Sequence, residues 1–320
     1  MKQTLGPIRK YWPQYEWSNV FAMIRNMSTA PDTCEQDFRD RLVVITGATS
    51  GIGYHTARKY ASRGARLLTV NRNGEKAQAL CEEIQSDFGA SCDYILADLS
   101  RLEDIHGAGR ALAALAEPIA VLIHNAGLYL SRRTVTEDGL ETNFAVHFLA
   151  PFVINHLLRE KLQRDRQGRI LFVSSEGYRF AVWGLRLDDL QWEKRRYGSL
   201  KAYGAAKIAQ ILTMHILAEE LAESDVTVNA MHPGMVRTSS GRENARTYRW
   251  FKQHIIDNLS QQADISAEAL YYLGVSPALK DVTGRFFHLT REEALTPPAR
   301  DRDVAARLWQ ISLELGRLQR

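Results

Sequence analysis

Cysteine is scarce in this sequence, which has only Cys34, Cys81 and Cys92 among 320 residues. The three form no Cys-x-x-Cys pair and no metal-site spacing, and their odd number does not suit a disulfide framework. Free thiols in a reducing compartment are the simplest interpretation, so we expect a cytoplasmic protein.

Long apolar runs and a strong charge of one sign are also lacking. The 41 basic and 37 acidic residues are interspersed and leave a net charge of +4, which predicts no nucleic-acid partner. The longest apolar run of the N-terminal segment, Val20 to Ile24, is too short for a signal-peptide core or a membrane span. There is no internal repeat or low-complexity stretch. The 45% of hydrophobic residues are enough to bury a large core.

The first 40 residues differ from the rest because aromatic and basic side chains are mixed in them. We therefore divide the chain into an extension, residues 1–40, and a main domain, residues 41–320. The extension is interpreted as an arm that packs on its own domain or is partly disordered. The alternative is peripheral contact with a membrane interface or a partner. The aromatic residues include Tyr11, Trp12, Tyr15, Trp17 and Phe21.

A regular pattern begins with the β-branched run Leu42 to Thr46, which is typical of a buried strand. A glycine-rich turn and a helix pattern from about Gly51 to Arg63 follow, and Ala65 to Val70 predicts a second buried strand. A βαβ unit of this kind cradles a pyrophosphate on main-chain N–H groups at the helix N-terminus. The sequence therefore predicts dinucleotide binding. The turn residues expected to contact the dinucleotide are Gly47, Thr49, Ser50, Gly51, Ile52 and Gly53.

The end of the second strand carries Asn71 and Arg72, with no carboxylate. An acidic residue here would bind the 2′-hydroxyl of NAD, whereas an arginine pairs with the 2′-phosphate of NADP. We therefore expect NADP(H) rather than NAD(H). At the end of a later strand, Asp98 and Leu99 are placed to contact the adenine, although a strand-end aspartate is also a common helix cap.

Strands and helices continue to alternate along the chain. Further strands are expected at 92–97, 119–123, 169–173, 226–231 and 284–288, and further helices at 74–87, 100–116, 137–163, 266–274 and 304–315. This order predicts an α/β fold: a single Rossmann-type doubly wound parallel sheet of about seven strands, with helices on both faces.

The best candidate for proton transfer is Tyr203 with Lys207. Residues four apart share a helix face, so both side chains point into one cleft. A nearby cation favours the phenolate, and we therefore expect Lys207 to lower the pKa of Tyr203. Tyr203 would then serve as a general acid or base, whereas the alternative is an exposed ion-pair spacing without function.

The motifs together resemble the short-chain dehydrogenase/reductase family, and the chain is most similar to its retinol-dehydrogenase-like members. The resemblance rests on TGATSGIG (46–53), HNAG (124–127), Asn143, VSS (173–175), YGAAK (203–207) and HPGMVRT (232–238), in the family's order over about 250 residues. The retinol-dehydrogenase-like stretches are TEDGLETNFAVHFL (136–149), DDLQWEKRRY (188–197), TGRFF (283–287) and the tail 297–315. His124 departs from the family's usual asparagine, and no long hydrophobic anchor is present.

The resemblance implies a role for each matching position. Ser175, with Ser174 as the alternative, would hydrogen-bond the substrate oxygen, Tyr203 would transfer the proton, and Lys207 would bind the nicotinamide ribose. Asn143 would hold a water that links Lys207 to solvent. Further cofactor contacts are implied for Asn125, Ala126, Gly127, Pro233, Gly234, Val236 and Thr238.

The implied activity is reversible hydride transfer between NADP(H) and a carbonyl or alcohol. Two aromatic loops, 176–202 and 239–258, suggest a lipophilic or ring-bearing substrate, and they are equally compatible with lid packing or a homodimer or homotetramer contact. An NADP-binding regulator would lack part of the catalytic set, which is complete here. A sugar-nucleotide epimerase or dehydratase usually has TGxxGxxG and a larger C-terminal domain. A light-driven reductase of the protochlorophyllide type uses a cysteine beyond the tyrosine helix, and none follows it.

Overall fold

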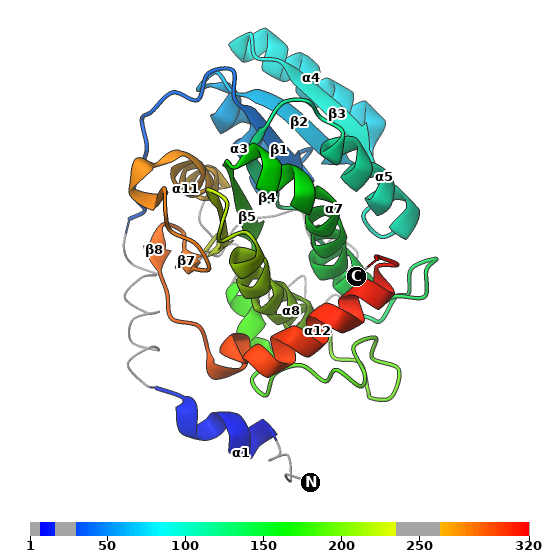
Figure 1. The fold of residues 1–320 in the computed structure, drawn as a ribbon. Coiled ribbons are helices and arrows are strands. Elements are labelled where there is room, and N and C mark those ends of the chain that lie inside the picture. Colours follow the sequence, from blue (N-terminus) through cyan, green and yellow to red (C-terminus); the bar gives the residue numbers. More distant parts are fainter. Residues whose placement is uncertain (1–6, 17–29, 235–262, 320) are drawn as a thin grey trace, which may run out of the picture.

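The computed structural model describes residues 7–16, 30–234 and 263–319, and these residues fold around one sheet (Figure 1). Its eight strands lie in the order β3-β2-β1-β4-β5-β6-β7-β8, and all neighbours are parallel except β7 and β8. The predicted Rossmann-type parallel sheet is confirmed, with one short antiparallel strand beyond the expected seven. The strands are β1 Leu42–Thr46, β2 Arg66–Asn71, β3 Cys92–Leu96, β4 Ile119–His124, β5 Gly168–Val173, β6 Val226–His232, β7 Phe286–His288 and β8 Arg291–Glu292.

Helices cover both faces of the sheet, as predicted. One face packs against α3 Gly51–Ala61, α4 Gly74–Phe88 and α11 Ala263–Val275. The other packs against α5 Leu102–Ala113, α7 Ala150–Asp165 and α8 Ser199–Glu220, and α12 Arg302–Leu315 lies across α8 (Figure 1). Because it is covered on both sides, β1 is buried at every position. Shorter elements are α1 Pro7–Tyr11, η1 Trp12–Gln14, α6 Thr142–Phe144, η2 Ala145–Leu149, η3 Glu176–Phe180, η5 Pro277–Leu279 and η6 Pro297–Arg300.

The strand order reverses between β1 and β4. From β1 the chain adds β2 and β3 on one side, and it then crosses over to add β4, β5 and β6 on the other. In doubly wound sheets the crevice outside the strand carboxyl ends at such a switch point is the usual ligand site. The loops after β1 and β4, which carry the predicted glycine turn and residues 125–127, therefore lie at one edge.

The long helix predicted for residues 137–163 is wrong in its first part. Residue Gly139 has a left-handed φ of 79°, and Val135 and Glu141 form an antiparallel bridge. The helix begins only at Thr142, where the Glu141 carboxylate accepts a hydrogen bond from Phe144 N at 2.8 Å. The π-helix η2 then separates α6 from α7.

The described part of the N-terminal extension packs on the main domain. Phe38 is buried, and its main-chain N donates to Arg63 O at 2.8 Å. Tyr11 in α1 is also buried, and its hydroxyl donates to Asp301 at 2.6 Å. Trp17 and Phe21 lie outside the described residues. Among the residues that are described, no helix is both long and apolar enough to cross a bilayer.

Candidate active site

The turn after β1 is shaped by two glycines that approach their neighbours too closely for any side chain. Gly47 has a φ of 70°, and a Cβ on it would lie 2.8 Å from Ala126 Cα. A Cβ on Gly53 would lie 2.3 Å from Gly47 O. The turn leads into α3, whose preceding residue Ser50 makes no side-chain cap. Free main-chain N–H groups in the first turn of a helix bind phosphate, and glycines without side chains leave room for it. The predicted turn therefore fits a dinucleotide.

Asn125 locks this turn to the loop after β4. Its Nδ2 donates to Gly47 O at 2.9 Å and to Thr46 O at 3.1 Å. Thr46 Oγ1 in turn accepts from the main-chain N of Asn125 and of Ala126, both at 3.0 Å. The structure therefore brings together the residues predicted at 47–53 and at 125–127.

At the end of β2, Asn71 and Arg72 differ in their surroundings. Asn71 is buried, and its Oδ1 accepts from Ala48 N at 2.9 Å, so its side chain supports the glycine turn from within. Arg72 is exposed, where a ligand phosphate can reach it.

Asp98 forms a local turn ahead of α5. Its Oδ1 accepts from Ser100 N at 2.9 Å and from Ser100 Oγ at 2.7 Å. Asp98 is not a helix cap, because α5 begins at Leu102 with Arg101 as its N-cap residue. The contact of Asp98 with the adenine stays a prediction.

Ser175, Tyr203 and Lys207 converge at the carboxyl end of β5. Ser175 caps η3 by accepting from Gly177 N at 3.0 Å, and its hydroxyl lies near enough to Tyr203 to lower the pKa of that phenol. One turn further along α8, Lys207 is buried, and its Nζ donates to Val173 O at 2.7 Å. Ser174, the alternative to Ser175, is buried with its hydroxyl unpartnered among the described residues. The spacing of the Tyr203 and Lys207 pair along α8 is therefore realised in space.

The pKa of Tyr203 moves in the direction opposite to our prediction. Burial raises this pKa, and the nearby Ser175 hydroxyl lowers it only in part. Lys207 Nζ lies 5.9 Å from the centre of the Tyr203 ring, and it donates a hydrogen bond to Val173 O. Burial lowers the pKa of Lys207 from 10.5 to about 7. Tyr203 is thus a protonated phenol near neutral pH, beside a lysine whose pKa is about 7.

Asn143 is not brought to Lys207 by any recorded hydrogen bond. Its Nδ2 donates to Glu141 at 2.8 Å and to the Tyr197 hydroxyl at 2.9 Å, and it is fully buried. These contacts fasten the segment before η2 to the 176–202 loop. Its Oδ1 is buried with no hydrogen-bond partner among the described residues, so the water-holding role stays a prediction.

His147, which no sequence motif singled out, lies against Tyr203 and close to Lys207. Its ring centre is 5.2 Å from that of Tyr203, at an interplanar angle of 87°. Burial and the nearby Lys207 lower its pKa to about 3, so the ring is neutral. Its Nε2 lies 2.6 Å from Leu128 O. The available signal was a histidine inside an otherwise apolar helical run, Phe144 to Leu149.

Tyr129 is a second residue that the sequence analysis missed. Its ring centre lies 5.8 Å from that of Tyr203, and its hydroxyl donates to Ser199 at 3.0 Å. It therefore forms a wall beside the phenol. No distinctive motif marked it, because a tyrosine in a loop is common.

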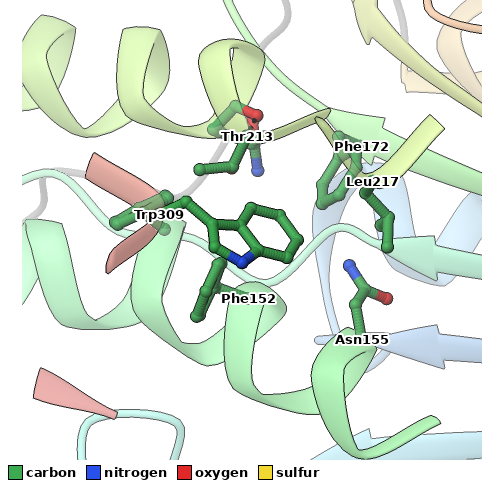
Figure 2. A pocket seen from close by; sticks show the side chains of 8 residues that line it. Phe152, Asn155, Phe172, Thr213, Leu217 and Trp309 are labelled. Atoms are coloured by element: carbon green, nitrogen blue, oxygen red, sulfur yellow. Dashed lines mark hydrogen bonds between the residues drawn. The ribbon is translucent and has the colours of Figure 1, made fainter. Parts of the chain in front are cut away.

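A small cavity lies between α7, α8, α12 and the end of β5 (Figure 2). The indole of Trp309 from α12 crosses its middle, and its volume of about 10 Å³ is near the lower limit for one water molecule. It is therefore no substrate pocket, and it does not include Ser175, Tyr203 or Lys207. The lining residues are Phe148, Phe152, Asn155, Phe172, Gln210, Thr213, Leu217 and Trp309.

The predicted substrate loops are described only in part. In 176–202, Tyr178 and Trp192 are buried and stabilise the loop, whereas Phe180 and Trp183 are exposed. Pro233 O accepts from Ser266 Oγ at 2.8 Å, and Gly234 has a φ of 75°. Val236, Thr238 and loop 239–258 lie outside the described residues. Across the described residues there is no His, Cys, Asp or Glu cluster suited to a metal.

Sequence comparisons place this site in a known context. Residues 41–184 match the family profile described as short chain dehydrogenase, and residues 190–290 match that described as Enoyl-(Acyl carrier protein) reductase. Human Retinol dehydrogenase 13 is 33% identical, over 87% of this chain and 85% of that protein. Retinol dehydrogenase 12 of Bos taurus is 32% identical, over 89% and 90% of the two chains.

Solved structures agree with the sequence comparisons. A protein from Mycobacterium paratuberculosis superposes with a TM-score of 0.69 at 27% identity, covering 89% of this chain and 96% of that one. A short-chain dehydrogenase from Sphingobium yanoikuyae, solved in complex with NADPH, gives 0.58 at 25% identity over 73% and 83%. The chain belongs to the short-chain dehydrogenase/reductase family, with retinol-dehydrogenase-like relatives, and is an NAD(P)-dependent oxidoreductase of CH–OH and C=O groups.

Proposed function

We propose that this protein transfers hydride between NADP(H) and the carbonyl or alcohol of a lipophilic or ring-bearing small molecule. The observation that carries the proposal is the convergence of Ser175, Tyr203 and Lys207 beside the glycine turn. The Ser175 hydroxyl and the Tyr203 ring both lie within 3.2 Å of the position that a Cβ on Gly177 would take, and this closeness supports joint action on one substrate oxygen.

The residues present fit a nicotinamide dinucleotide. The cradle between Gly47 and Gly53 would receive the pyrophosphate, because a side chain at either position would clash with the main chain or with Ala126. When bound, the nicotinamide supplies or accepts the hydride. Lys207 keeps two ammonium protons beyond its bond to Val173 O, and we assign these to the ribose hydroxyls.

In the reductive direction Ser175 donates a hydrogen bond to the carbonyl oxygen as negative charge develops there. Tyr203 then gives its hydroxyl proton to that oxygen. A raised pKa suits this step because the phenol is protonated at neutral pH and ready to act as an acid. In the oxidation of an alcohol the proton moves the other way, from the alcohol to the Tyr203 phenolate. This direction requires a cation, such as the Lys207 ammonium, near enough to stabilise the phenolate.

The preference for NADP(H) rests on Arg72. It is exposed at the end of β2, and no acidic side chain occupies position 71 or 72. We expect Arg72→Ala to weaken NADPH binding about tenfold or more while NADH binding changes little, because a charged hydrogen bond is worth about 1.5–3 kcal/mol. Calorimetry with both nucleotides measures this. Arg110→Ala, at an exposed arginine of α5, is the matched control. Equal losses for both nucleotides would place recognition of the 2′-phosphate elsewhere.

The preference for a lipophilic or ring-bearing substrate is supported by the aromatic side chains near Tyr203. Tyr129 borders the phenol, and Phe180 and Trp183 are exposed on the adjoining loop. The relatives named retinol dehydrogenase agree with such a substrate. NADPH absorbance against a panel of retinaldehyde, polycyclic ketones, aliphatic aldehydes and ketoses tests it. Faster reduction of the ketoses would contradict the preference, and no reduction or alcohol oxidation at all would contradict the function.

A peripheral membrane contact of the extension is a further part of the proposal. Ile8 and Trp12 are exposed on α1 and η1, and the Trp12 ring lies 6.5 Å from that of Trp183, so the extension joins the substrate loop in one aromatic surface. We expect the protein to sediment with vesicles of phosphatidylcholine and phosphatidylserine, and Trp12→Ser to release it. A protein that stays in the supernatant would exclude the contact.

A further inference from the structure

The π-helix η2 gives the chain an irregular turn directly beside the catalytic pair. A π-helical turn inserts one extra residue, so main-chain carbonyls around it must find partners outside the helix ladder. The carbonyl of His147 finds such a partner in Gln210, whose Nε2 donates to it at 3.0 Å. Both residues are almost fully buried. The bond therefore lies in a low-dielectric interior, where an unmade hydrogen bond is costly.

Gln210 belongs to the same helix as the catalytic residues. Positions 203, 207 and 210 are spaced by four and three, so Tyr203, Lys207 and Gln210 follow one another along one face of α8. Gln210 thus continues the catalytic face by one turn. A hydrogen bond at Gln210 therefore fixes the rotation of α8 about its axis one turn beyond Lys207.

His147 contacts α8 a second time, through its side chain. The ring packs edge-on against Tyr203, and Nε2 fastens it to the Leu128 main chain. There is no room for the ring to shift toward the 125–127 loop, because a Cβ on Gly127 would already lie 2.5 Å from His147 Cε1. The same residue therefore contacts the catalytic helix at Tyr203 with its ring and at Gln210 with its carbonyl.

We propose that Gln210 is a positioning residue for hydride transfer. Gln210 and His147 together clamp α8, and the clamp holds the side chains of Tyr203 and Lys207 in the positions that the reaction requires. This inference rests on the proposed function and adds two residues to its machinery. Neither is assigned contact with substrate or cofactor. Lys207 is buried, so a shift of α8 would open its ammonium to water. Among the described residues, the titratable groups that face Lys207 are His147 on η2, Tyr203 on α8 and His232 on β6.

The test is Gln210→Met, which keeps the volume and removes the amide. Thr213→Val is the matched control, because Thr213 lies on the same helix and lines the same cavity but bonds only to carbonyls of α8. Since a displacement of about 1 Å at a catalytic group can cost about a hundredfold in rate, we expect kcat for NADPH-dependent reduction to fall about tenfold to a hundredfold in Gln210→Met. KM and the Kd for NADPH should change little, and the control should match the wild type.

A second readout does not depend on turnover. In protein labelled with [ε-¹³C]lysine, the Lys207 signal is assigned by its loss in Lys207→Met, and its pKa is read from a pH titration of the chemical shift. We expect this pKa to rise by about one unit or more in Gln210→Met, because water gains access to the ammonium.

The two readouts separate failure of the clamp from failure of the function. Unchanged kcat and an unchanged Lys207 titration in Gln210→Met overturn the clamp while leaving the oxidoreductase intact. If the wild type reduced no carbonyl, the proposed function would fail, and the titration alone would decide whether Gln210 holds Lys207 in place. A fall in kcat matched by Thr213→Val would also overturn the clamp, since it would show a general packing defect.

Discussion

Replacing Lys207 by methionine should stabilise the protein at acidic pH and abolish its activity. Burial lowers the pKa of Lys207 from 10.5 to about 7, so the folded state holds the charged lysine at a cost that the unfolded chain does not bear. Lys207 is 3% exposed, and the hydrogen-bond partner of its Nζ among the described residues is Val173 O, so no ion pair there offsets this cost. Methionine has a similar length and no charge.

The size of the effect follows from the pKa difference and from its sign. Because the folded pKa is depressed, the unfolded chain binds more protons between pH 7 and pH 10.5, and stability rises with pH across that window. At about 1.36 kcal/mol per pKa unit, the charged lysine costs about 5 kcal/mol at pH 6 and about 1.4 kcal/mol at pH 9.5. The variant leaves Val173 O without its donor, which costs about 1–3 kcal/mol. We therefore expect Lys207→Met to gain about 2–4 kcal/mol at pH 6 and to lose that advantage at pH 9.5.

Urea denaturation at the two pH values, followed by tryptophan fluorescence and circular dichroism, measures the difference. Equal m-values would show that the variant changes stability and not the extent of unfolding. Lys201→Met, at an exposed lysine of the same helix, is the control and should change little at either pH. A Lys207→Met protein that is less stable than the wild type by the same amount at pH 6 and pH 9.5 would refute the reasoning. It would mean that the folded protein holds the ammonium as well as water does.

Further predictions concern the serine, a glycine and the N-terminal helix. Ser175→Ala should lower kcat about 10²–10³-fold with little change in the Kd for NADPH, because it removes a donor to the developing oxyanion; a fall in nucleotide affinity instead of kcat would contradict this. Gly127→Ala places a methyl group 2.5 Å from His147 Cε1 and should destabilise the protein by about 1–3 kcal/mol in urea denaturation, with His147→Ala in the same chain restoring part of the loss; no destabilisation would contradict the close contact. Tyr11→Phe removes the hydroxyl that donates to Asp301 and should speed tryptic cleavage after Arg9 and Lys10, whereas an unchanged cleavage rate would show that α1 is held by other contacts.

The sheet was predictable because strands covered on both faces appear in the sequence as short apolar runs. The run at 42–46 coincides with β1, and the apolar run predicted at 169–173 falls within β5. The helix predicted from Glu137 failed for a local reason, since the left-handed Gly139 and the Glu141 cap postpone its start to Thr142. The spacing of apolar residues there indicated a helical period, but it did not indicate the residue at which the helix begins.

The candidate site was predictable where spacing fixes geometry. Four residues along one helix placed Tyr203 and Lys207 on one face, and the glycine turn met residues 125–127 because both follow adjacent parallel strands. The direction of the Tyr203 pKa could not be predicted, because it depends mainly on burial of the phenol, which residue spacing does not show. His147 was missed for a similar reason. The π-helical turn directs the His147 ring toward Tyr203, and the apolar pattern of Phe144 to Leu149 does not indicate such a turn.

The most direct test of the account compares Tyr203→Phe with the wild type in two assays on the same preparations. NADPH affinity is measured by calorimetry, and turnover is measured by NADPH absorbance with the best carbonyl of the panel. We predict that the variant binds NADPH as the wild type does and loses nearly all turnover, because only the hydroxyl that donates the proton is gone. Equal turnover in the two proteins would contradict the assignment of Tyr203 as the acid.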